Sequence, residues 1–198
     1  MGQIASSTGN TCAMAIQPKL VTVVEFEQFL ALPENRDHSF ELIHGEIVEK
    51  VPTEEHGLIA GNIHGFLWQY TRQSGFGRAV IEVRVCMPED DYNSRQPDLA
   101  FFADTTRPVV KRGPVFQMPD LVIEVKSPDD TYTSMRERAQ YYLAHGAKLV
   151  WLIYPAKRLV EVYRQDADSD ILTADDTLQG DDVLPGFVLS VHEIFALN

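Results

Sequence analysis

Apolar residues spaced three and four positions apart predict three helices in this chain. The clearest helix covers residues 56–73, where the apolar positions fall on one side and Gly75 marks the end. A second helix is predicted over residues 131–144, closed by Gly146, and a third over residues 22–30. We expect the helix at residues 56–73 to cross over a sheet with its apolar side inward.

Short apolar runs, and runs in which apolar and polar residues alternate, predict strands between these helices. Turn-forming residues bracket most of these runs. The predicted strands cover residues 40–51 as a hairpin, 79–87, 96–102, 119–128, 148–154, 158–164 and, as a short pair, 171–178.

The order of helices and strands predicts an α/β sandwich with a mixed central β-sheet flanked by helices. At 198 residues the chain suits one domain with a full hydrophobic core. Residues 1–17 contain no charged side chain and are rich in small polar residues, so we expect a disordered tail at residues 1–19. The folded domain is then predicted at residues 20–198.

The run from Pro119 to Pro128 reads as a buried strand that carries two charges. Side chains alternate along a strand, so Glu124 and Lys126 are expected on one face. A carboxylate in an apolar layer is costly unless a cation or hydrogen-bond donors compensate it. Glu124 therefore requires Lys126, a metal ion or both. The alternative is an exposed strand end where the two charges pair across water.

A second acid stands at the start of another predicted strand. Asp98 directly follows Pro97 and precedes the apolar run at residues 99–102. If the two strands lie side by side, Asp98 and Glu124 come together. Two carboxylates that close are tolerated mainly when a divalent cation lies between them. A structural salt bridge is the alternative for both acids.

Six short blocks follow one another in a fixed order along the chain. They are ELIHGEI at residues 41–47, PDLA at 97–100, PDLVIEV followed by SP at 119–128, a Tyr and a Gly at 142 and 146, VWLI and a Pro at 150–155, and LPGF at 184–187. Together they resemble the Uma2 family of restriction-type endonucleases, formerly a domain of unknown function, in the PD-(D/E)xK nuclease superfamily. The resemblance covers about residue 21 to the C-terminus and implies a restriction-endonuclease-like fold.

The resemblance implies hydrolysis of DNA phosphodiester bonds with Mg²⁺, for which Mn²⁺ would substitute. Asp98 and Glu124 would supply carboxylates, and the carbonyl of Val125 a third oxygen, because hard cations take oxygen ligands. Lys126 would orient or deprotonate the attacking water and offset negative charge in the transition state. Glu41 aligns with an early acid that in the superfamily touches a metal-bound water or a second ion, and a structural role is the alternative.

The lysine position departs from the family pattern. Many members have an apolar residue where this chain has Lys126, and carry a lysine on the following helix where this chain has Arg138. Arginine does not act as a base at neutral pH, so Arg138 would bind phosphate or stabilise charge, or else lie on a solvated helix face. His56 matches a histidine recurrent at this helix start in the family, and we expect it beside the site or in a cap or surface role. For Glu82, a cross-strand pair with Arg84 is the preferred interpretation.

The charge balance argues against strong DNA binding by the chain alone. Lys and Arg number 17 against 29 Asp and Glu, a formal net charge of −12. Affinity for nucleic acid comes largely from neutralising phosphates. We therefore expect weak DNA affinity or a need for a partner. A homodimer is expected because cutting both strands of a duplex favours two-fold symmetry.

Other features indicate the cellular setting and leave two further functions open. No apolar run is long enough to span a bilayer, and two cysteines make no disulfide framework, which fits the cytoplasm of a bacterium. The chain is alternatively a catalytically weak or inactive module that binds DNA or a partner on a nuclease scaffold. A phosphodiesterase acting on RNA or nucleotides with the same ions is the third interpretation.

Overall fold

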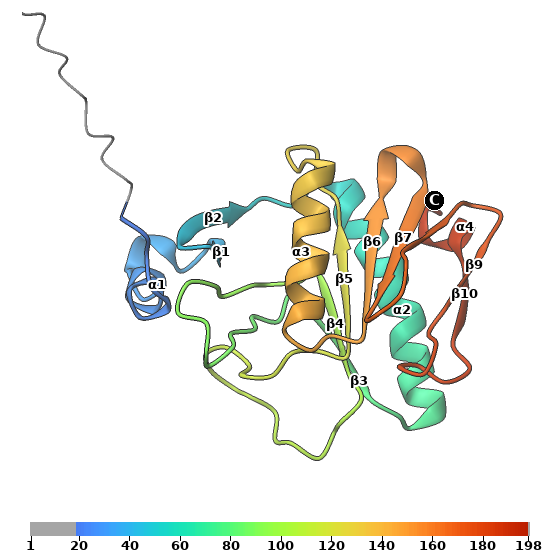
Figure 1. Cartoon of the computed structure of the whole chain (residues 1–198), viewed down its shortest axis with the longest axis horizontal. Helices are drawn as coiled ribbons and strands as arrows, with labels where there is room; N and C mark the ends of the chain where they lie inside the picture. Colours follow the sequence, from blue (N-terminus) through green and yellow to red (C-terminus); the bar gives the residue numbers. More distant parts are fainter. Residues whose placement is uncertain (1–18, 198) are drawn as a thin grey trace, which may run out of the picture.

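The computed structural model describes residues 19–197, so nearly all of the predicted tail lies outside the described residues (Figure 1). Within the described part, no helix is both long and apolar enough to cross a bilayer. The helices are α1 (Val23–Leu30), α2 (Glu54–Ser74), α3 (Tyr132–Ala144) and α4 (Val191–Ile194), with short 3-10 turns η1 (Pro33–Asn35) and η2 (Pro155–Lys157). The strands are β1 (Ser39–Ile43), β2 (Glu46–Lys50), β3 (Arg78–Ile81), β4 (Leu99–Phe102), β5 (Leu121–Val125), β6 (Leu149–Tyr154), β7 (Leu159–Arg164), β8 (Asp170–Leu172), β9 (Thr177–Gln179) and β10 (Val188–Ser190).

A six-stranded sheet in the order β3-β4-β5-β6-β7-β8 forms the centre of the molecule. Strands β5 and β6 run parallel, while the other neighbours in this sheet are antiparallel. Figure 1 shows α3 on one face of the sheet and α2 on the opposite face. The predicted α/β sandwich with a mixed central sheet is thereby confirmed. The α3 crossover joins the parallel pair, as such a connection requires.

The two faces of β5 belong to different parts of the core. Leu121 and Ile123 pack with the apolar side of α2, whereas Val122 packs with Ala139 and Tyr142 of α3. The first three residues of β5 are completely buried, and the last two, Glu124 and Val125, are 3% and 2% exposed. The period-2 pattern therefore assigned these side chains to their faces correctly.

The hairpin β1–β2 stands beside the central sheet rather than within it (Figure 1). It turns at His44 and Gly45, as predicted, and a bridge between Leu42 and Ser94 ties it to the chain before β4. Its strands end where Ser39 pairs with Lys50. Since only three residues separate Lys50 from α2, the end of the hairpin is held close to the start of that helix.

The predicted strand at residues 79–87 is wrong beyond Ile81. Ile81 pairs with Leu99, which is the first residue of β4, so the residues after Ile81 lack a strand partner there. Glu82 turns the chain with a positive φ of 48°. Arg84 then pairs with Glu27 instead of Glu82, so the expected cross-strand pair is also wrong.

The expected strand pair at residues 171–178 is wrong as well. Strand β8 extends the central sheet by pairing with β7, and β9 pairs with β10 in a separate two-stranded sheet. Both segments are strands, but each has its partner elsewhere in the chain. Sequence periodicity detects a strand and does not identify its partner.

Candidate active site

A cleft of about 550 Å³ lies between the hairpin β1–β2 and the ends of β4 and β5. The start of α2 and the chain leading into α3 complete its walls. Its charged side chains come from β2, α2, β5 and α3 and from the loops beside them. The lining residues discussed below are Lys50, His56, Asp98, Glu124, Val125 and Arg138.

Asp98 and Glu124 are neighbours because β4 and β5 are antiparallel. Leu99 pairs with Ile123 and Ala100 with Val122, so the same register places Asp98 opposite Glu124. Directly opposed residues project to the same face of a sheet. Asp98 is 4% exposed and Glu124 3% exposed. The predicted pair of acids is therefore brought together at one edge of the cleft.

Three donors hold the Asp98 carboxylate. Lys50 Nζ lies 2.7 Å from Oδ1, while His56 Nε2 and the backbone nitrogen of Val125 lie 3.0 and 2.8 Å from Oδ2. Burial opposes ionisation, but the hydrogen bond from His56 and the charge of Lys50 outweigh it and hold the pKa of Asp98 well below its usual range. Asp98 is thus a fixed carboxylate anion at neutral pH.

The same contact affects His56. Its side chain is 8% exposed, and burial alone would lower its pKa. The hydrogen bond with Asp98 and the aspartate's charge outweigh this penalty, so the pKa of His56 is raised. His56 thus lies beside the site, the first of the two positions that the sequence left open.

Glu124 has the opposite electrostatic character. Its Oε1 accepts a hydrogen bond of 2.6 Å from the hydroxyl of Tyr142, and Arg138 Nη1 lies 3.7 Å from the same oxygen. Its Oε2 has no hydrogen-bond partner among residues 19–197. Burial and the charge of Asp98 raise the pKa of Glu124 to about 7. Asp98 is therefore ionised at neutral pH, whereas Glu124 titrates close to neutral pH.

Glu41 and Arg138 form a second ion pair behind this edge. Glu41 is completely buried; its Oε1 accepts from the backbone nitrogen of Gln96 at 2.6 Å and its Oε2 from Arg138 Nη1 at 2.9 Å. Burial opposes the charge of Arg138, but Glu124 and Glu41 raise the pKa of the guanidinium. Both residues predicted from the sequence therefore lie with the acid pair, and Arg138 is not on a solvated helix face.

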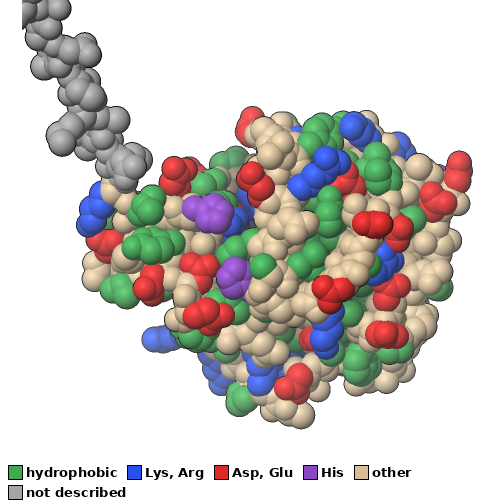
Figure 2. All heavy atoms as spheres, viewed as in Figure 1, with side chains coloured by type: hydrophobic (Ala, Val, Ile, Leu, Met, Phe, Trp, Pro, Cys, Tyr) green, Lys and Arg blue, Asp and Glu red, His purple; other side chains and the backbone are tan. Residues whose placement is uncertain are grey.

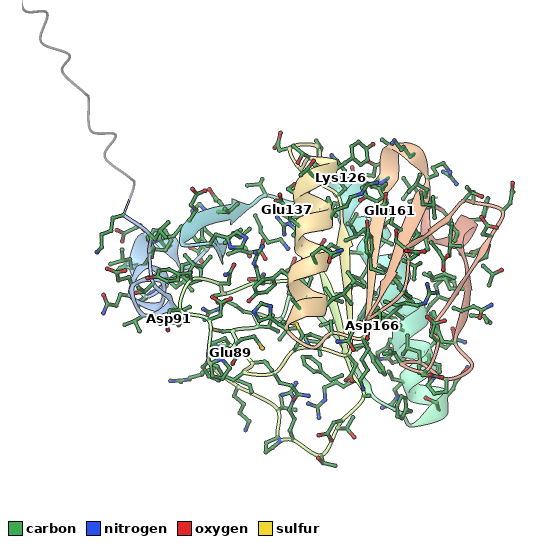
Figure 3. The ribbon with its side chains drawn as sticks, in the orientation of Figure 1. Glu89, Asp91, Lys126, Glu137, Glu161 and Asp166 are labelled. Carbon is green, nitrogen blue, oxygen red and sulfur yellow. The ribbon has the colours of Figure 1, made fainter. Side chains whose placement is uncertain are left out.

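The structure does not bring Lys126 into the cleft. Strand β5 ends at Val125, and the Lys126 ammonium lies 2.8 Å from the carbonyl oxygen of Ser127 and 5.7 Å from the centre of the Tyr132 ring. Figure 3 shows Lys126 beyond the end of β5, near the start of α3. The prediction that Lys126 shares a pocket with both acids is therefore wrong. Strand alternation fixes the direction in which a side chain leaves the backbone, but it does not fix the position of an ammonium group at the end of a four-carbon chain.

Two residues of the site were missed from the sequence. Lys50 looked like the polar end of a hairpin, and nothing local indicated that it reaches Asp98, 48 positions later. Tyr142 carried a signal, because it lies four residues after Arg138 and therefore on the same face of α3. Its hydroxyl is the sole hydrogen-bond donor given to Glu124 within the described part of the chain.

The oxygen atoms at this edge fit a small hard cation. Within residues 19–197 no three His, Cys, Asp or Glu side chains are arranged as a ready-made metal cluster. Mg²⁺, however, commonly uses one or two carboxylates and keeps several waters. Glu124 Oε2 and the remaining lone pair of Asp98 offer two such donors. The backbone nitrogen of Val125 lies 2.8 Å from Asp98 Oδ2, and the carbonyl of the same residue stays the expected third oxygen.

A second hollow, of about 720 Å³, shares no lining residue with this cleft and lies between the end of α3 and the loop after β7. Its charged lining residues are Arg164, which is half-buried, and the exposed Asp166 and Asp168. It presents no buried polar group that lacks a partner among the described residues. The buried acids therefore line the smaller of the two hollows.

The surface around the cleft carries charges of both signs. Figure 2 shows Lys and Arg side chains interspersed with Asp and Glu over the face that it draws. No broad basic surface is visible on that face, in keeping with the formal charge of −12. Binding of a polyanion on this face would therefore depend on local groups rather than on a broad basic surface.

Comparisons with known proteins agree with this architecture. Residues 26–192 match the family model of Uma2, described as "Putative restriction endonuclease". A crystal structure described as a putative nuclease belonging to DUF820 from Anabaena variabilis ATCC 29413 is 26% identical, with a TM-score of 0.72, over 85% of this chain and 96% of that chain. A DrdV–DNA complex, 13% identical over 58% of this chain and 85% of that one, has a TM-score of 0.30, too low to carry weight. A comparison with curated proteins finds no match.

Proposed function

The chain belongs to the Uma2 family of restriction-endonuclease-like proteins, and from this premise we propose that it is a Mg²⁺-dependent endonuclease that hydrolyses DNA phosphodiester bonds in the cleft. The observation that carries the proposal is the pair Asp98 and Glu124, opposed across β4 and β5 at the cleft edge. Mn²⁺ is the expected substitute for Mg²⁺.

The charge balance of the site supports a cation there. Three buried acids, Glu41, Asp98 and Glu124, lie with two permanent cations, Lys50 and Arg138, and with His56, whose pKa is raised. Burial and the charge of Asp98 raise the pKa of Glu124 to about 7 despite the nearby cations Arg138 and Lys50. A divalent ion at Glu124 Oε2 would take the place of the proton that the raised pKa of Glu124 favours.

Hydrolysis of a phosphodiester requires an attacking water, a leaving oxygen and groups that stabilise negative charge. A water oxygen forms a bond to phosphorus, the bond to the leaving oxygen breaks, the water gives one proton to solvent, and the leaving oxygen takes one up. Bound Mg²⁺ would lower the pKa of the water and stabilise charge on the phosphoryl oxygens. Arg138 fixes Glu41 and neighbours Glu124, while Tyr142 orients Glu124 by its hydrogen bond.

Plasmid cleavage in Mg²⁺, in Mn²⁺ and in EDTA tests the proposal. Asp98→Asn and Glu124→Gln are expected to lose at least about 100-fold in rate, since each removes a proposed ligand. Glu161→Gln is the matched control, because Glu161 is a buried acid held by Arg136 on another part of the sheet. Equal activity in Asp98→Asn and wild type would refute the site.

A second function is favoured by the state of Asp98. Lys50, His56 and the Val125 amide already occupy three of its four lone-pair sites, an arrangement also suited to an inactive scaffold that binds DNA or a partner. Calorimetric titration with Mn²⁺ separates the two functions: the enzyme binds the ion and loses binding in Asp98→Asn. Light scattering after size exclusion tests the expected homodimer.

A further inference from the structure

The structure offers a different lysine from the one that the sequence motif contains. Lys50, the last residue of β2, lines the cleft and places Nζ 2.7 Å from Asp98 Oδ1. Lys126, two residues after Glu124, has its Nζ on the Ser127 carbonyl and the Tyr132 ring. Only Lys50 of these two therefore presents an ammonium group to the acid pair.

The Lys50 ammonium has capacity left for a ligand. Its two acceptors within residues 19–197 are Asp98 Oδ1 and the carbonyl oxygen of Gln96, both at 2.7 Å. An ammonium group has three donors, so one N–H remains. The side chain is 17% exposed, which leaves it partly open to the cleft. A nearby anionic oxygen can take up this third donor.

Holding Asp98 in place does not require Lys50. His56 Nε2 and the backbone N–H of Val125 both bind Oδ2 of Asp98, and these two donors come from α2 and β5. They fix the orientation of the carboxylate from two directions. Lys50 adds a positive charge on the other oxygen, at the side from which β2 approaches.

We propose that Lys50 is the ammonium group of this site and that it contacts a non-bridging phosphate oxygen of the substrate, in the place expected for Lys126. The inference rests on the proposed nuclease activity and names the residue that binds the phosphate. Lys50 keeps its proton throughout and donates a hydrogen bond to the phosphate, where it offsets the negative charge that builds up on the phosphoryl oxygens.

Three variants separate Lys50 from Lys126. Lys50→Met keeps most of the length and removes the charge, and Lys50→Gln also keeps a donor for Asp98 in case the Met variant does not fold. Lys126→Met is the matched control, with the same change at the lysine outside the cleft. Each variant is measured for its unfolding midpoint, its Mn²⁺ affinity, its affinity for inorganic phosphate in the presence of Mn²⁺, and its DNA cleavage rate.

We expect the Lys50 variants to bind Mn²⁺ as well as wild type or better, since a competing cation has left Asp98. Their phosphate affinity should fall about tenfold, the loss of one charged hydrogen bond. Their cleavage rate should fall about 100-fold, as for loss of one charge-stabilising donor. Lys126→Met should stay within about threefold of wild type in every assay.

Three outcomes overturn the inference. These are a loss of phosphate affinity or cleavage in Lys126→Met that matches or exceeds the loss in the Lys50 variants, an unchanged phosphate affinity in Lys50→Gln, and a wild-type protein that binds no phosphate with Mn²⁺. A wild type that binds phosphate but cleaves no phosphodiester refutes the nuclease function alone, and the phosphate affinities then still decide the role of Lys50.

Discussion

Metal binding at this site should depend strongly on pH, because the ion must displace the proton of Glu124. Burial and Asp98 raise the pKa of Glu124 to about 7 from an ordinary value of 4.5. At pH 8 roughly nine-tenths of the molecules have the Glu124 carboxylate ionised, and at pH 5.5 only about one in thirty. The Mn²⁺ dissociation constant should therefore be about 30-fold larger at pH 5.5, a difference of about 2 kcal/mol.

Isothermal titration between pH 5.5 and pH 8 measures this directly. At pH 7, heats recorded in two buffers of different ionisation enthalpy should reveal about half a proton released per ion bound. Above pH 8 the affinity should level off. His56→Gln serves as a control, because the pKa of His56 is also raised and its titration would otherwise overlap.

A flat profile would refute the reasoning. If the wild-type dissociation constant changes less than about threefold from pH 5.5 to pH 8, Glu124 is not the protonated ligand that the geometry describes. The same holds if Glu124→Gln still binds Mn²⁺ with the wild-type pH slope. In either case the bound ion lies elsewhere or is held by Asp98 without its neighbour.

The same titration affects the stability of the metal-free protein. The raised pKa of Glu124 means that the folded state holds more protons than the unfolded state between pH 4.5 and 7. The free energy of unfolding should thus fall by up to about 3 kcal/mol as pH rises through this window. The lowered pKa of Asp98 acts below this window, where stability is lost as pH falls. In urea unfolding, the Glu124→Gln variant in the His56→Gln background should not show this fall in the free energy of unfolding between pH 4.5 and 7.

Two further predictions concern stability. Arg138→Met should cost about 3–5 kcal/mol in urea unfolding, because it leaves the fully buried Glu41 without its cation; a loss below about 1 kcal/mol would contradict the buried ion pair. Gly77→Ala should destabilise more than Gly75→Ala by about 2 kcal/mol or more, since both have positive φ but a Cβ on Gly77 would meet the Phe101 ring at 1.9 Å whereas Gly75 faces open space. Equal unfolding midpoints for the two alanine variants would show that the ring moves aside freely.

The sequence by itself determined the central strand, the faces of its side chains and the two candidate acids. A period of two along β5 assigned Ile123 and Glu124 to opposite faces, and the structure has them there. Asp98 was found because a proline and an apolar run mark the start of β4. The four-residue spacing of Arg138 and Tyr142 likewise places both on one face of α3. Local spacing is sufficient for these features, because each depends on the geometry of one element.

Only the tertiary structure decided which lysine meets the acids and where the edge strand stops. Lys50 reaches Asp98 across 48 residues because the hairpin docks beside the central sheet, and no local pattern encodes that docking. Lys126 starts near Glu124 yet ends on Tyr132, since a long flexible side chain takes its end point from its surroundings. Strand pairing at Ile81 ends for a similar reason, because its partner strand begins there. Contacts between distant segments depend on packing, which sequence spacing does not contain.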